Sequence, residues 1–106
     1  MTTEQNQAET KHPLKQEADR ILDEYFEVIE GISDIMEGNN KPEEIRKQAR
    51  TIYMETYKAG MRLMAESLRK KKDLGEEDQF KEDVEVMRKI YDVAVEARKR
   101  AEALLG

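Results

Sequence analysis

Three stretches of the sequence carry apolar residues at alternating spacings of three and four, and this pattern constrains the fold more than any other feature. Such spacing places the side chains on one face of an α-helix. The repeated positions are Ala18, Ile21, Tyr25, Val28, Ile32 and Ile35, then Ile45, Ala49, Ile52, Thr56, Ala59 and Leu63, and finally Met87, Ile90, Ala94, Ala97, Ala101 and Leu104. We therefore expect three long helices with the regular heptad seams that are typical of coiled coils.

Two short breaks separate these stretches. Residues 38–40 (Gly-Asn-Asn) precede the second stretch, and residues 73–75 (Asp-Leu-Gly) precede the third. Asn40 and Glu43 have the spacing of a capping box at the start of the second helix. Short connections force consecutive helices to pack as antiparallel neighbours. The sequence thus predicts an all-α fold, an up-down-up antiparallel three-helix bundle with helices at about 13–37, 42–72 and 76–105, open to completion by dimerisation.

The N-terminal residues and two internal glycines bear on where the helices begin and whether they are continuous. Residues 1–11 are polar and lack periodicity, which predicts a disordered tail before a single helical domain over 12–106. Gly31 and Gly60 lie inside the helical patterns, where glycine costs up to about 1 kcal/mol relative to alanine. Because the apolar seams stay in phase across both glycines, we expect unbroken helices. A break at Gly60, giving four helices, is the alternative.

The composition excludes several classes of function. The chain has no cysteine and one histidine, His12, so we expect no disulfide framework, no metal centre that needs two imidazoles and no cofactor. A net charge of −5 argues against non-specific nucleic-acid binding. The sequence lacks an apolar run of about 18 residues and a signal-peptide pattern at its polar start, so we expect no membrane span and a cytoplasmic protein.

The charge is distributed unevenly along the chain. Residues 1–38 carry 3 cations and 10 acids, residues 39–75 carry 10 and 5, and residues 76–106 carry 6 and 9. Six acids lie within about 80° of the helical wheel, opposite the first seam; this acidic stripe consists of Asp19, Asp23, Glu27, Glu30, Asp34 and Glu37. A solvated outer face is the plain interpretation, a docking surface for a basic partner is the functional one, and a divalent-cation site is a third.

The second helix carries more apolar surface than its seam requires. A second row at the same spacing is rotated about 150° from the first, and with Phe26 at the margin of the first helix it makes up the predicted partner-binding set: Met54, Tyr57, Met61, Met64, Leu68 and Phe26. Methionines that fill gaps between neighbouring helices would account for it. A homodimer contact or a Met-rich groove for a partner helix is the alternative, and a site for a small apolar ligand is a third.

Catalytic signals are weak. The acid pairs of the first and third helices project mainly to the polar face, and only Glu24 lies near a seam. Arg46, Arg50 and Arg98 interrupt the apolar arcs near helix ends, where their long stems reach solvent. The basic run of residues 69–72 suits the negative end of a helix dipole.

The sequence accordingly predicts a non-catalytic protein-interaction module. We expect a small adaptor, inhibitor or chaperone-like bundle that binds a protein partner or a second copy through the Met- and Tyr-rich face, with steering by the acidic stripe. No small-molecule substrate is evident. The alternatives are a small helical enzyme that uses carboxylate or arginine side chains and an engineered bundle without a natural ligand, although Gly31 and Gly60 are unusual in idealised designs.

Overall fold

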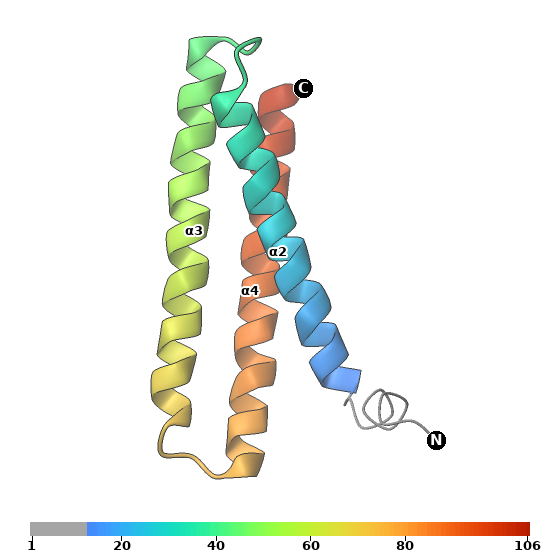
Figure 1. Ribbon diagram of the computed structural model, residues 1–106, viewed down its shortest axis with the longest axis vertical. Coiled ribbons are helices and arrows are strands. Elements are labelled where there is room, and N and C mark those ends of the chain that lie inside the picture. Colours follow the sequence, from blue (N-terminus) through green and yellow to red (C-terminus); the bar gives the residue numbers. More distant parts are fainter. Residues whose placement is uncertain (1–12) are drawn as a thin grey trace, which may run out of the picture.

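The computed structural model describes residues 13–106, which form three helices joined by two short turns (Figure 1). The helices are α2 (Pro13–Glu37), α3 (Glu43–Lys71) and α4 (Glu76–Leu105). They run up, down and up, and each packs against both of the others. The predicted three-helix bundle is therefore confirmed, while the predicted tail at 1–11 lies outside the described residues. Within the described part, α2 runs unbroken through Gly31 and α3 through Gly60, as the phase of the seams predicted.

One core runs between the three helices. Its buried apolar residues are Ile21, Tyr25, Val28, Ile29, Ile32 and Ile35 of α2, Ala49 and Ile52 of α3, and Val86, Ile90, Ala94, Ala97 and Ala101 of α4. Most of these are the predicted seam positions, because the period of the helix dictates which side chains share a face. Burial of each large aliphatic side chain contributes roughly 1.5–3 kcal/mol.

The second half of α3 departs from its predicted seam. The structure buries Gly60 and Ser67, whereas the expected core positions Ala59 and Leu63 are only half-buried. Tyr25 of α2 explains the change, since its fully buried ring lies against α3 at Gly60. The Tyr25 hydroxyl donates to the backbone carbonyl of Thr56 at 3.0 Å, with the Tyr57 carbonyl at 3.3 Å. The large side chain of Tyr25 on α2 is therefore accommodated at the level of α3 where the residue, Gly60, has no side chain.

The two turns are held by side chains that donate to backbone carbonyls. The guanidinium of Arg46 donates to the carbonyl of Met36 at 3.3 Å, which satisfies an acceptor at the end of α2. The Gln79 amide donates to the carbonyls of Lys71 at 3.1 Å and Leu74 at 2.9 Å. The predicted capping box of Asn40 and Glu43 is wrong: α3 begins after Pro42, and no side chain caps its amides.

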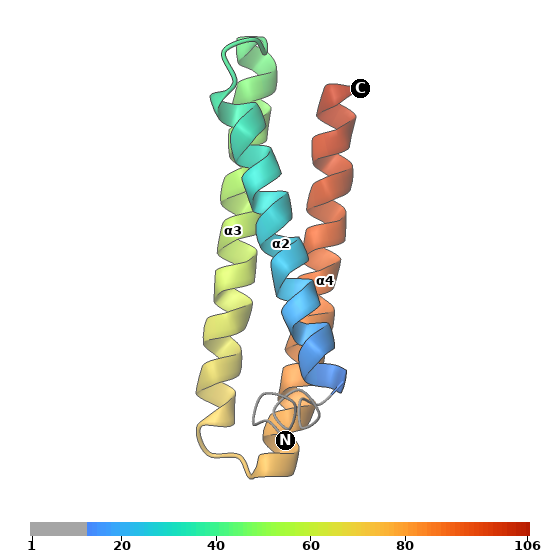
Figure 2. The same cartoon turned by 45° about the vertical axis from the view of Figure 1, so that its right-hand side comes forward.

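The helix α2 is inclined to the other two helices. Figures 1 and 2 show that α2 ends beside α3 and that the two ribbons diverge toward the start of α2. The first turns of α2 line a pocket together with α4. The last two turns of α3 therefore have less cover from α2 than its first turns. Among the described residues, none of the helices is apolar over a length that would span a bilayer.

Candidate functional site

The six predicted partner-binding residues divide into an exposed and a half-buried group. Phe26, Met54, Tyr57 and Leu68 are 47%, 45%, 43% and 68% exposed, whereas Met61 and Met64 are half-buried against the core. Gap filling between neighbours therefore accounts for the two methionines but not for the other four side chains. We call the six residues the apolar patch; it lies on α3 and on the adjoining side of α2.

Aromatic contacts within each helix support the exposed rings of this patch. The rings of Tyr53 and Tyr57 are parallel with their centroids 6.1 Å apart, and Tyr25 meets Phe26 edge to face at 5.1 Å. Both arrangements are favourable for aromatic pairs. Because Tyr25 is fixed in the core, the exposed ring of Phe26 rests on a rigid support.

The acidic stripe borders the same face. All six of its carboxylates are exposed, and Asp23, Glu27 and Glu30 line an open hollow of about 620 Å³ together with Phe26, Ile29, Ser33 and Tyr53. In the part of the chain that the structure describes, Asp23, Glu27, Glu30, Asp34 and Glu37 form no ion pair. Nor does any group of three or more acidic or histidine side chains within residues 13–106 form a metal-binding cluster.

A row of cations occupies the outer side of α3. This basic row consists of Lys47, Arg50, Lys58 and Arg62, all exposed and, within residues 13–106, without an ion-pair partner. The face formed by α2 and α3 thus carries acids along one helix, cations along the other and apolar side chains between them.

The ion pairs that cross between helices all involve α4. Arg98 pairs with Glu24 of α2 at 2.8 Å, Arg100 pairs with Glu55 of α3 at 2.7 Å, and Asp83 pairs with Lys71 at 2.7 Å. Across the described residues, no ion pair joins α2 to α3. Three charged pairs with α4 are therefore formed within the chain, whereas five acids of the acidic stripe and the cations of the basic row have no ion-pair partner among the described residues.

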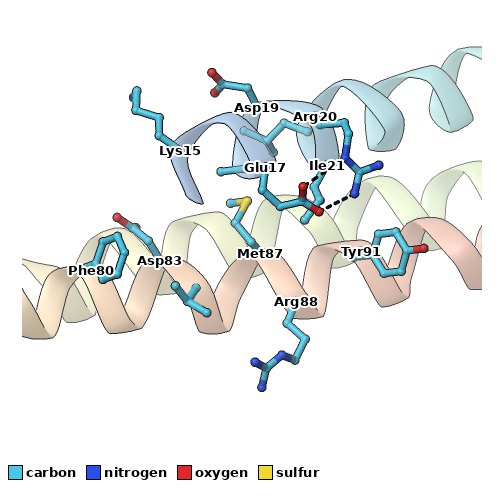
Figure 3. A pocket seen from close by; sticks show the side chains of 13 residues that line it. Lys15, Glu17, Asp19, Arg20, Ile21, Phe80, Asp83, Met87, Arg88 and Tyr91 are labelled. Carbon is cyan, nitrogen blue, oxygen red and sulfur yellow. Dashed lines mark hydrogen bonds and ion pairs between the residues drawn. The ribbon is translucent and has the colours of Figure 1, made fainter. Parts of the chain in front are cut away.

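A separate pocket of about 700 Å³ lies between the start of α2 and α4 (Figure 3). Its apolar lining comes from Ala18, Ile21 and Leu22 on α2 and from Phe80, Val84, Met87 and Tyr91 on α4. At its rim Arg20 donates to Glu17, and this hydrogen bond lowers the pKa of the Glu17 carboxyl. Sequence reasoning missed this pocket, although Phe80, Val84, Met87 and Tyr91 recur at spacings of three and four.

The candidate catalytic side chains occupy structural positions at the surface. Glu24 pairs with Arg98, Arg46 binds the end of α2, and Arg50 is exposed. Tyr25 is the titratable side chain that the structure buries completely; burial raises its pKa, with smaller contributions from Tyr57 and Tyr53. Its hydroxyl is engaged by backbone carbonyls rather than directed into a pocket.

Comparisons of the chain with protein-family models, with curated protein sequences and with solved structures found no match.

Proposed function

We propose that the chain is a non-catalytic protein-interaction module, a small adaptor, inhibitor or chaperone-like bundle of the cytoplasm, that binds its partner through the apolar patch. The observation that carries the proposal is the exposure of Phe26, Met54, Tyr57 and Leu68 on one face, flanked by charges without partners in the described part of the chain. Contiguous apolar surface with a charged border is typical of protein contacts.

The patch and the charges would contribute differently to binding. Large aromatic and aliphatic side chains that become desolvated supply most of the affinity at protein interfaces. Exposed charges at the rim chiefly raise the association rate and select between partners. Tyr57 and Phe26 are suitable anchors because their stacked and edge-to-face contacts restrict them before binding.

The alternative of a carboxylate or arginine enzyme has less support. Catalytic acid–base groups need burial or a nearby charge that shifts their pKa toward neutral pH. Glu24 and Arg98, the cross-helix pair nearest to that description, lie 20% and 43% exposed and satisfy one another.

Site-specific photo-cross-linking tests the proposal. A photoreactive phenylalanine analogue at position 57 or 68 should give a discrete covalent adduct in a lysate of the native host. The same analogue at Lys99, an exposed position on the outer side of α4, is the matched control.

The mass of the adduct separates the possible partners. Twice the mass of the chain identifies a second copy, and any other discrete mass identifies a different protein. Adducts that form equally from the Lys99 position, or no adduct at either patch position, would contradict the proposed function.

A further inference from the structure

We infer that the partner seated on the apolar patch is a second copy of this chain, placed so that α2 of each copy faces α3 of the other. The inference rests on the proposed interaction function and identifies its partner. It corresponds to a two-fold axis parallel to the helices, which turns the two α2–α3 faces toward each other. The four helices then form an antiparallel four-helix bundle, since α2 and α3 run in opposite directions.

The register within one chain determines which charges meet. The Tyr25 hydroxyl reaches the carbonyl of Thr56, and Arg46 reaches the carbonyl of Met36, so these residues mark common levels on α2 and α3. Because α2 and α3 are antiparallel, a move along the bundle that raises the residue number on α2 lowers the residue number on α3 by about the same amount. By this register Asp34, Glu30 and Asp23 lie within about one helical turn of the levels of Lys47, Arg50 and Lys58.

A two-fold axis parallel to the helices preserves these levels. Each acid of one copy therefore meets a cation of the other copy at its own height, and the symmetry repeats every pair. In the single chain these six side chains have no ion-pair partner among the described residues, whereas the pairs facing α4 are formed. After the two-fold rotation, the unpaired acids on α2 of one copy therefore lie opposite the unpaired cations on α3 of the other copy.

The other face-to-face two-fold arrangement is unfavourable. An axis in the face and perpendicular to the helices would place α2 against α2 and bring the two acidic stripes together. Like charges directed at each other across an interface oppose association. The charge pattern therefore selects the parallel axis and, with it, the contact of Phe26 with the Met54–Tyr57 region of the other copy.

Charge reversal with mixing tests this arrangement. One variant carries Lys47→Glu, Arg50→Glu and Lys58→Glu, and the other carries Asp23→Lys, Glu30→Lys and Asp34→Lys. All six positions are exposed, so both variants should keep the helical circular-dichroism spectrum of the unmodified chain. Analytical ultracentrifugation of each purified chain at low salt measures the dimer directly.

We expect the unmodified chain to dimerise, each variant alone to dimerise at least about tenfold more weakly, and an equimolar mixture to recover the dimer. Recovery on mixing shows that the variants are folded and that the charges act in pairs. A monomer at every concentration, or a dimer that both reversals leave unchanged, would overturn the inference. Purified monomers together with a position-57 adduct of another mass would refute the second copy and leave the proposed function standing.

Discussion

The hydroxyl of Tyr25 occupies the space that a Cβ atom at Gly60 would need. A Cβ atom built on Gly60 would overlap with the hydroxyl oxygen and Cζ of Tyr25. The same ring is fully buried and bonded to the carbonyl of Thr56. Close contact between α2 and α3 at this level therefore depends on a glycine in the middle of a helix.

Alanine substitutions at the two mid-helix glycines should have opposite effects. Gly60→Ala forces Tyr25 out of its position, and we expect a net loss of about 1–3 kcal/mol in the free energy of unfolding despite the better helix propensity. Gly31→Ala is the matched control because nothing lies within 4 Å of its Cβ, and it should stabilise by up to about 1 kcal/mol. Urea denaturation measures both, and equal effects would refute the close contact.

Tyr25→Phe should remove the hydrogen bond while keeping the ring. We expect a loss of about 1 kcal/mol, the usual net value of one hydrogen bond. Burial raises the pKa of Tyr25, so its stabilising contribution is complete below the pKa of the unfolded chain, near 10, and is lost as the pH rises through the folded value. Stability of the unmodified chain should therefore fall above about pH 10, and more steeply than that of Tyr25→Phe, in denaturation series monitored at several alkaline pH values.

Much of the fold follows from the sequence alone because helical periodicity and turn residues are local. The seam containing Ile21, Tyr25 and Ile32 is buried as expected, and short turns leave little choice of topology. Which residues of the second half of α3 are buried is not determined by local sequence. It depends on the fit of Tyr25 to Gly60, which no pattern within one helix reveals.

The sequence predicts which residues belong to the candidate surface, but not how exposed each of them is. The helical wheel shows excess apolar width on the second helix, but the inclination of α2 decides which of these side chains α2 covers. The angle at which helices cross depends in general on how the ridges and grooves of their surfaces fit together. Leu68 is exposed, whereas Met61 and Met64 pack against the core. The ion pairs with α4 were likewise missed, since each joins residues distant in the sequence.

Leu68→Glu should separate association from stability. Its side chain is 68% exposed, so we expect the free energy of unfolding to change by no more than about 0.5 kcal/mol. Association should weaken because a charge replaces an apolar contact. Leu105→Glu, at an exposed leucine near the end of α4, is the control and should leave the native mass in solution unchanged. An equal effect of both substitutions on the native mass would argue against a specific contact at the patch.

Neutralising the acidic stripe should stabilise the chain and weaken its association. Replacing Asp23, Glu27, Glu30 and Asp34 with their amides removes like-charge neighbours along α2, which should stabilise the helix by a few tenths of a kcal/mol per pair. The association constant should fall, and by more at low salt than at high salt, because salt screens exposed charges. Sedimentation at two salt concentrations measures this difference, and a loss that is independent of salt would exclude electrostatic steering.

Cysteine cross-linking across the interface tests the central claim most directly. The chain contains no cysteine, so Asp23→Cys combined with Lys58→Cys introduces the reacting thiols. With α2 facing α3 of the other copy, a short bismaleimide should join two chains of the double variant into a covalent dimer, whereas each single variant should remain at 12.4 kDa on a denaturing gel. A covalent dimer from Asp23→Cys alone, or none from the double variant, would contradict the arrangement.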